Sequence, residues 1–305
     1  MIDKGKIISW IKLMRLEFYS MPFVVYSLGA LISLRFNDFF FLKNYLVGYL
    51  IIFLIELATV LTNEYYDLEG DKLNKNPGRF TGGSRMLVEN KIFLRELKRP
   101  FIFAILSFFI LSLFLFKITF FSNQVLLLLM LGFLLGISYT APPLKFSYRG
   151  LGEFDVAVIH GFYVIICGYV FQKGILDLHI IWAISLPIFF SSIAGVSLAG
   201  IADIKSDKLV SKNSVAVIIG PKNTLIFSML CGIVTGGIGI SLGSNPIIGD
   251  FSYLYFFLTV YSIFLSFSIV KAIKKFDFKI DNLILKTMIF IALSVFIPFI
   301  IFIFY

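Results

Sequence analysis

Nine long apolar runs alternate with polar segments along the 305-residue chain. Each run approaches the roughly 20 residues that an α-helix needs to cross the hydrocarbon core of a bilayer. A backbone inside a bilayer must satisfy its own hydrogen bonds, so only helices and closed barrels span it. The sequence therefore predicts an all-α, polytopic membrane protein. We place the nine spans near residues 18–34, 44–62, 101–121, 124–141, 154–172, 179–201, 223–243, 252–270 and 283–305.

The composition agrees with this interpretation. Hydrophobic residues make up 59% of the chain, and 37 residues are Phe. A soluble domain of this composition would expose large apolar patches, whereas lipid covers such patches in a membrane protein. We therefore expect the lipid bilayer to be the main partner of the protein surface.

The basic residues are divided unevenly between the two sides of the membrane that nine spans define. If the N-terminus is cytoplasmic, all but four of the 27 Lys and Arg residues fall on the cytoplasmic side. The exceptions are Arg35, Lys43, Lys117 and Lys173. Cytoplasmic loops carry an excess of basic residues, so we expect a multi-pass protein of the cell membrane with its N-terminus inside and its C-terminus outside. The net charge of +9 follows largely from this topology, and we expect no nucleic-acid partner.

Two short polar segments carry aspartates at the cytoplasmic ends of the second and sixth predicted spans. NEYYDLEGD follows the second span and places Asn63, Asp67 and Asp71 at steps of four. GIADIKSDKL closes the sixth span, and its Asp203 and Asp207 repeat the step 136 positions later. Residues four apart on a helix lie on one face. Each segment therefore predicts a stripe of polar side chains that points one way.

The constant offset between the two aspartate pairs indicates an internal repeat. We expect a single transmembrane domain, residues 1–305, built from two parallel halves of about residues 10–150 and 151–305. The second and sixth spans then run in the same direction, and both stripes end at the same membrane face. Because one chain contains both stripes, a monomer is possible.

Carboxylates that converge on one cavity repel each other unless cations bind between them. Mg²⁺ binds through one or two carboxylates together with water and phosphate oxygens. Two Mg²⁺ ions between the stripes would bind a pyrophosphate group and stabilise the negative charge that develops as this group leaves. The expected metal ligands are Asn63, Asp67, Asp71, Asp203 and Asp207. The alternative is that these acids are solvated helix ends paired with Lys72, Lys205 and Lys208.

The paired acidic motifs resemble those of the UbiA superfamily of intramembrane aromatic prenyltransferases. MRLEFYSMP and KNSVAVIIG agree with this resemblance, and FTGGSRMLVEN and SYTAPPLKFSYRGLGE are similar to loops of its naphthoate, or menaquinone-type, branch. The match extends from about Trp10 to Gly220. The chain departs from the pattern at Ala199, which replaces a counterpart of Asn63, and at Ala202, where relatives often carry Pro or Arg. Menaquinone enzymes also usually have a longer gap between the first-motif acids.

The resemblance implies nine transmembrane helices around a central cavity. It also implies Mg²⁺-dependent transfer of an isoprenyl chain from an isoprenyl diphosphate to an aromatic acceptor. That acceptor would be a quinone precursor such as 1,4-dihydroxy-2-naphthoate. Asp67 and Asp203 would then be catalytic through the metal ions. Tyr139 and Lys145, in the matched YTAPPLK segment, are the other catalytic candidates.

Basic residues on the cytoplasmic side are candidates for binding the diphosphate. Arg contacts phosphate through two N–H groups, whereas Lys acts as a compact charge. The resemblance favours Arg15 and Lys145, and the GGSR loop favours Arg85. The remaining candidates are Lys72, Arg79 and Lys208. For each of them the alternative is a surface charge that only follows the topology.

Tyr139 and Glu56 are candidates for contacts deeper in the site. The π face of Tyr139 would favour an allylic cation, although an interfacial aromatic belt is the alternative. Glu56 lies seven residues before Asn63 and therefore shares its helix face. Glu56 would bind an acceptor hydroxyl or take its proton, or it would make a structural hydrogen bond to another helix. Asp155 reads as a helix-capping residue and Glu153 as a weaker site candidate.

The polar segment from Lys72 to Pro100 is the longest in the chain. Its NKNPGRFTGGSR portion predicts irregular structure, and KIFLRELKR predicts an interfacial helix. The whole segment is either a lid over the cytoplasmic opening or a plain connecting loop.

Three other functions remain open on the sequence. Within the enzymes, these are an ether-lipid synthase of the geranylgeranylglyceryl-phosphate type and a UbiA-type terpene cyclase. GRFTGGSR argues against the former, whose relatives carry an RPIP-like segment there. A cation-coupled secondary transporter is the alternative of a different class. Transporter sites, however, lie near the bilayer midplane, often within inverted repeats.

Overall fold

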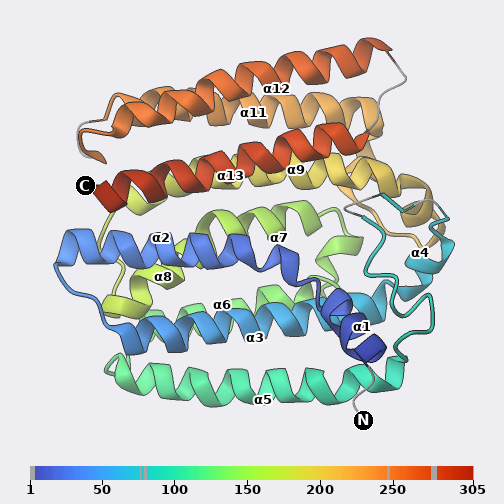
Figure 1. Ribbon diagram of the computed structural model, residues 1–305, viewed down its shortest axis with the longest axis horizontal. Helices are drawn as coiled ribbons and strands as arrows, with labels where there is room; N and C mark the ends of the chain where they lie inside the picture. The colour runs from blue at the N-terminus through green and yellow to red at the C-terminus, as the bar shows by residue number, and fades with distance from the viewer. Residues whose placement is uncertain (1–3, 76, 79–80, 246–247, 276–279, 305) are drawn as a thin grey trace.

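The computed structural model describes residues 4–75, 77–78, 81–245, 248–275 and 280–304. Its long helices run roughly side by side in stacked layers (Figure 1). Within these ranges there is no strand, and an isolated parallel bridge joins Arg149 to Asn213. The all-α prediction is confirmed.

Each of the nine predicted spans contains a helix. In chain order these are α2 (Ser20–Asn37), α3 (Leu42–Tyr66), α5 (Leu94–Ile118), α6 (Asn123–Ser138), α7 (Gly152–Val158) continued by the π-helical turn η3 (Ile159–Tyr163) and α8 (Val164–Lys173), α9 (Ile180–Leu209), α11 (Pro221–Gly243), α12 (Phe256–Lys275) and α13 (Ile280–Phe304). Shorter elements are α1 (Lys4–Met14), η1 (Leu16–Phe18), α4 (Leu68–Leu73), η2 (Phe146–Tyr148), α10 (Val215–Ile219) and η5 (Ser252–Tyr255).

Seven helical segments in the described part of the chain are long and apolar enough to cross a membrane. The segment 152–173, made of α7, η3 and α8, counts as one of them. Two of the predicted runs fall outside this set: α2, which is long enough with 18 residues but not apolar enough, and α6, which has only 16 residues. A multi-pass membrane protein is therefore supported, and the count of nine spans stays a prediction.

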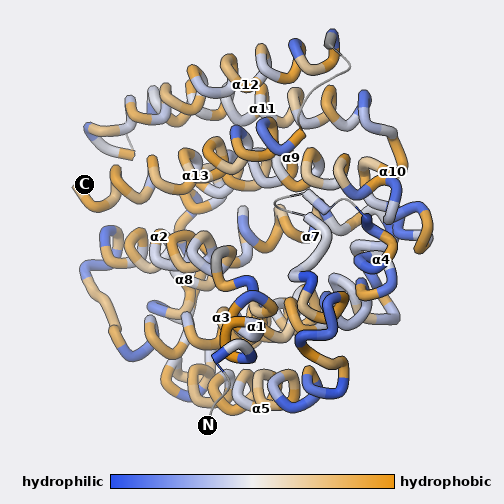
Figure 2. Tube along the Cα trace, turned by 45° about the vertical axis from the view of Figure 1, so that its right-hand side comes forward, coloured by the Kyte–Doolittle hydropathy of each residue, from blue (hydrophilic) through white to orange (hydrophobic). Residues whose placement is uncertain are grey.

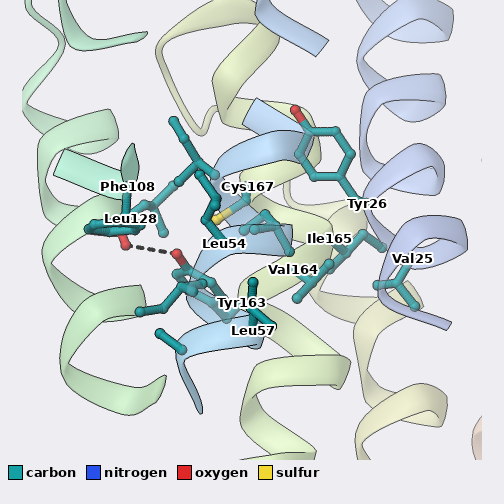
Figure 3. Packing of buried hydrophobic residues seen from close by; sticks show 14 of the residues in the cluster. Val25, Tyr26, Leu54, Leu57, Phe108, Leu128, Tyr163, Val164, Ile165 and Cys167 are labelled. Carbon is teal, nitrogen blue, oxygen red and sulfur yellow. Dashed lines mark hydrogen bonds between the residues drawn. The ribbon is translucent and has the colours of Figure 1, made fainter. Parts of the chain in front are cut away.

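One hydrophobic cluster joins α2, α3, α5, α6 and α8. Figure 3 shows Leu54 and Leu57 of α3 beside side chains of α8, with Phe108 of α5 and Leu128 of α6 close by. The hydroxyl of Tyr163 donates a hydrogen bond of 3.0 Å to the carbonyl oxygen of Leu128. In lipid, helices associate through close packing and such interhelical hydrogen bonds.

A second cluster joins α9, α11, α12 and α13. Contacts of α13 with α2, and of α9 with α7 and η3, hold the two clusters together. The core does not divide at residue 150, because α8 packs mainly on α2. The internal repeat itself stays a prediction.

The predicted interfacial helix is part of a longer helix. α5 begins at Leu94 and continues through Pro100, so KIFLRELKR does not form a separate element. The Glu96 side chain accepts a hydrogen bond from the Phe93 main-chain nitrogen at 2.9 Å and caps the start of α5. The described part of the preceding segment, between α4 and α5, is irregular, as predicted. Its function as a lid stays a prediction.

Hydrophilic residues gather at one end of the bundle. Figure 2 shows them around α4 and α10, whereas hydrophobic residues dominate the long helices. The C-terminus lies at the opposite end of the molecule from α4 (Figure 1). The acidic motifs therefore lie at an edge of the bundle, not at its middle.

The backbones of α2 and α8 touch at two glycines. A Cβ atom on Gly29 would overlap the carbonyl oxygen of Ile165, and one on Gly168 would overlap that of Tyr26. Both positions must lack a side chain for the helices to approach this closely.

We expect Gly168→Ala to lower the melting temperature by several degrees, because one added methyl group forces the two helices apart at a cost of about 1–3 kcal/mol. Thermal unfolding of the purified protein in detergent measures this effect. Gly237→Ala is the matched control, since no atom lies within 4 Å of a Cβ at that position in α11. Equal melting temperatures for the two variants would contradict the packing argument.

Candidate active site

The first acidic motif crosses a break between two helices. α3 ends at Tyr66 and α4 begins at Leu68, so Asp67 occupies the junction. The motif is therefore divided between two helices. The Asp67 nitrogen nevertheless donates to the Asn63 carbonyl, and the Asp71 nitrogen donates to the Asp67 carbonyl, each at 2.9 Å. These bonds keep the step of four, and all three side chains line one cavity.

This cavity has a volume of about 190 Å³ and lies between the α3–α4 junction and the end of α9. Asp203 and Asp207, both on α9, line its opposite wall together with Ala199. The structure thus brings the two acidic motifs together, as the sequence predicted. The predicted site residues that line this cavity are Arg15, Asn63, Asp67, Asp71, Tyr139, Asp203 and Asp207.

Both carboxylate oxygens of Asp67 have protein partners. Lys212 Nζ lies 2.7 Å from Oδ2, and the Tyr148 hydroxyl donates to Oδ1 at 2.7 Å. Burial lowers the pKa of Lys212, but Asp67 and other neighbouring groups, among them Asp207, together outweigh this effect and hold the pKa above its ordinary value. Burial and the charge of Asp67 raise the pKa of Tyr148. Lys212 is therefore charged and Tyr148 keeps its proton as a donor.

Asp71 is packed against the glycine-rich loop. A Cβ atom on Gly83 would overlap the Asp71 carboxylate, so a side chain at this position would displace Asp71. Gly83 also has a positive φ of 69°, which glycine adopts readily. Burial first, and then the charges of Asp67 and Glu64, raise the pKa of Asp71 to about 7. Without a cation, this carboxyl group is poised to hold a proton near neutral pH.

The second motif is held by hydrogen bonds from neighbouring loops. Asn74 Nδ2 donates to Asp203 Oδ1 at 2.9 Å, and Ser214 Oγ donates to Asp207 Oδ2 at 3.0 Å. Glu153, which also lines the cavity, accepts a 2.8 Å hydrogen bond from the main-chain nitrogen of residue 215. These contacts hold the segment after α9 against the cavity wall.

The donor set suits a hard cation such as Mg²⁺, because all the predicted ligand atoms are oxygens. Asn63 Oδ1 is buried and lacks a hydrogen-bond partner, so an oxygen is available for an ion or a ligand. Within the described ranges, no group of three or more His, Cys, Asp or Glu residues is close enough to hold an ion alone. The residues therefore fit Mg²⁺ ions whose coordination is completed by phosphate oxygens and water, as is usual for this ion.

The other predicted site residues lie outside the cavity lining. Lys145 Nζ lies 4.9 Å from the ring centroid of Tyr148, the tyrosine whose hydroxyl donates to Asp67. Arg85 Nη1 donates to the main-chain oxygens of Asp71 and Asn74, so it braces the loop. Lys72 and Lys208 have exposed side chains, and Glu56 is partly buried in α3. Arg79 lies outside the described residues. The functions assigned to all of these residues stay predictions.

Lys212 and Tyr148 are two lining residues that the sequence reasoning missed. Both occur in segments that carry the family resemblance, KNSVAVIIG and SYTAPPLKFSYRGLGE, but neither is among the predicted site residues. The proposed capping function of Asp155 is wrong, because neither of its carboxylate oxygens, which are both buried, has a hydrogen-bond partner. Contacts such as Lys212–Asp67 join residues far apart in the chain, so spacing alone does not reveal them.

Sequence comparison identifies the family. The profile of the UbiA prenyltransferase family matches residues 22–296. The chain belongs to this family. It is therefore a prenyltransferase, which decides against the transporter alternative. No curated protein was found to match the chain in sequence.

Solved structures of UbiA proteins share the fold. A digeranylgeranylglyceryl phosphate synthase is 18% identical with a TM-score of 0.69, and the alignment covers 98% of this chain and 99% of that protein. A UbiA homologue from Aeropyrum pernix K1 is 20% identical, with a TM-score of 0.64 and coverages of 94% and 96%. A UbiA homologue from Archaeoglobus fulgidus bound to GPP and Mg²⁺ is 15% identical, with a TM-score of 0.66 and coverages of 96% and 99%. The predicted UbiA-like fold is confirmed.

We expect Asp71→Asn to stabilise the protein in the absence of divalent cations at pH 8. A carboxyl group whose pKa rises on folding, here from 3.8 to about 7, makes the folded state less stable as the pH increases between these two values. The melting temperature should therefore increase by a few degrees at pH 8 and by less at pH 5, where Asp71 is already protonated. Thermal melts at the two pH values with a chelator measure the difference.

The exposed residue Glu69, two positions away, provides the control. Glu69→Gln should leave the melting temperature nearly unchanged at both pH values. A gain for Asp71→Asn that is the same at pH 5 and pH 8 would show that its charge is not the cause.

Proposed function

We propose that this UbiA-family enzyme transfers an isoprenyl chain from an isoprenyl diphosphate to an aromatic acceptor with the help of two Mg²⁺ ions. The observation that carries the proposal is the convergence of two acidic walls on one cavity that also contains Arg15 and Lys212. Acids that bind cations and bases that bind phosphate are the two components that an ionising diphosphate requires. The structural neighbour from Archaeoglobus fulgidus, bound to GPP and Mg²⁺, supports the same substrate class.

The two walls divide the ligands between them. Asn63, Asp67 and Asp71 would hold one ion, and Asp203 and Asp207 would hold the other. When bound, Mg²⁺ supplies Lewis-acid stabilisation of the negative charge on the departing diphosphate.

The protein side chains act on the substrate in three ways. Arg15 and Lys212 add positive charge at the diphosphate, and burial of the cavity strengthens these contacts. We assign to Tyr139, also in the lining, a π contact with the allylic carbon. Lys145 increases the positive potential near Tyr148. The allylic C–O bond breaks with its electron pair leaving on diphosphate, and a new bond forms to a ring carbon of the acceptor. That carbon then loses its proton to the released diphosphate.

The aromatic nature of the acceptor rests on the loops that resemble the naphthoate branch. We propose a quinone precursor of the 1,4-dihydroxy-2-naphthoate type. Glu56, two helical turns from Asn63 along α3, would bind its hydroxyl group. Glyceryl phosphate and cyclisation without any acceptor remain the competing reactions.

We expect Asp67→Ala and Asp203→Ala each to reduce turnover on the order of 100-fold or more, because each removes a metal ligand on one wall. Release of diphosphate from an isoprenyl diphosphate, with excess Mg²⁺ and acceptor, measures this loss. Glu69→Gln is the matched control within the first motif, since this exposed acid should leave turnover unchanged. Turnover near the parent rate in both alanine variants would contradict the metal assignment.

We expect the purified protein to join the prenyl group to an aromatic acid in a mixture of acceptors. The mixture contains dihydroxynaphthoate, hydroxybenzoate and geranylgeranylglyceryl phosphate, each offered with prenyl diphosphates of several lengths. Mass spectrometry identifies the product. A product only on the glyceryl phosphate, or a cyclic hydrocarbon formed without acceptor, would overturn the aromatic assignment while leaving the diphosphate chemistry intact.

A further inference from the structure

Lys212 occupies the place next to Asp67 that the proposed function gives to a metal ion. Its ammonium group lies 2.7 Å from Asp67 Oδ2, and Tyr148 takes the other oxygen. Both oxygens of Asp67 therefore have a protein partner. By contrast, Asn63 Oδ1 in the same lining has no hydrogen-bond partner. Asp67 can bind a metal ion only if one of its present partners moves away or shares its oxygen.

Resting on the proposed function, we propose that Lys212 is an exchangeable internal cation. It neutralises Asp67 before the metal ion binds, and it then transfers from Asp67 to the diphosphate when metal and substrate are both present. In this way the same positive charge serves two partners in succession.

Electrostatics selects Lys212, and not Tyr148, as the partner that leaves. Lys212 is positively charged, so an incoming Mg²⁺ repels it, while a diphosphate attracts it. The Tyr148 hydroxyl is neutral, and one oxygen of Asp67 can keep its bond to it while the other binds the ion. The exchange replaces one cation by another, so the Asp67 carboxylate is compensated before and after.

The backbone around Lys212 is anchored, so only its side chain needs to move. The main-chain nitrogen of Lys212 donates to the Asp207 carbonyl at 2.9 Å, and that of Asn213 donates to the Tyr148 carbonyl at 3.3 Å. The neighbouring Ser214 is bound to the Asp207 side chain. A lysine has a flexible four-carbon stem. Rotation about this stem moves the ammonium group by several ångströms from a fixed backbone position.

The negative charges around Lys212 make its position sensitive to what else is bound. Asp67, Asp207 and Glu153 line the same cavity as Lys212, and Asp67 is the member in direct contact. A second cation among these acids weakens their hold on the ammonium group. The diphosphate offers a new anionic partner within the same cavity.

The test compares metal binding with pyrophosphate binding in Lys212→Met. Mn²⁺ serves as the probe, because its electron paramagnetic resonance signal reports the free ion during a titration of the full-length protein in detergent. Without pyrophosphate, we expect the variant to bind Mn²⁺ more tightly than the parent, on the order of tenfold, since a competing charge is gone. With saturating Mg²⁺, calorimetry should show weaker binding of inorganic pyrophosphate, also on the order of tenfold.

Lys205→Met is the matched control. Lys205 lies on α9 between the two aspartates of the second motif, but its side chain is exposed and does not line the cavity. The control removes one positive charge from the same region of the chain, so it should change neither affinity by more than about twofold. If both variants changed the two affinities equally, the cause would be the lower net charge. That result would overturn the proposed exchange.

A conservative variant should change Mn²⁺ binding in the opposite direction. Lys212→Arg keeps the charge, and a guanidinium group binds a carboxylate through two N–H groups, so it should be harder to displace and should weaken Mn²⁺ binding. Thermal melts add a second measurement: Lys212→Met should melt lower than the parent without divalent ions and recover with Mn²⁺. If Lys212→Met does not fold, the arginine variant alone decides the question.

Three results would overturn the exchange. These are unchanged or weaker Mn²⁺ binding in Lys212→Met, unchanged pyrophosphate binding in that variant, and unchanged or tighter Mn²⁺ binding in Lys212→Arg. Failure of the proposed function has a different signature. In that case Asp67→Asn in the otherwise unchanged protein would bind Mn²⁺ as well as the parent does.

Discussion

Repulsion among aspartates around one small cavity is the constraint that the polar end of this protein must satisfy. Lys212 and Tyr148 bind the two oxygens of Asp67. On the other wall, Asn74 donates to Asp203, and a serine donates to Asp207. Asp71 is not paired with a base in this way, and its raised pKa reflects burial beside other acids. The cavity therefore holds its acids in a partly compensated state, which suits a site that gains cations when it functions.

The apolar bundle determines where these acids meet. α2 and α8 approach so closely that their glycines leave no space for a side chain. α13 contacts both α2 and α9, and it thereby connects the two hydrophobic clusters. Close packing and interhelical hydrogen bonds such as those of Tyr163 with Leu128 and Ser191 with Ser294 fix the positions of the helices. The polar ends of α3 and α9 therefore face the same cavity.

The first acidic motif passes from α3 into the short α4, which begins directly after Asp67. α4 contacts α9, so Asp71 lies close to the wall that carries the second motif. The glycine-rich loop then packs on Asp71 through Gly83. The lining of this cavity contains both acidic side chains and basic ones such as Arg15. A diphosphate in the cavity would lie close to both.

The exchange proposed for Lys212 links these features. An enzyme that binds a metal–diphosphate complex needs acidic side chains for the cations and basic side chains for the anion in one small volume. When the substrate is absent, these opposite charges satisfy each other, as Lys212 and Asp67 do. When it is present, each charge has a partner on the substrate. The same residues then stabilise both states of the site.

The sequence by itself determined the membrane class, the helical fold and the two acidic motifs, because these follow from local rules. An apolar run of bilayer length must be helical, and a step of four places side chains on one face. The sequence also indicated Arg15 and Tyr139, which line the cavity, through their resemblance to family segments. Only the tertiary structure decided that Lys212 pairs with Asp67, 145 residues away in the chain, and that Arg85 braces a loop. Charges on one side of a membrane all follow the same compositional rule, so only their distances in space distinguish those at the cavity from those on the surface.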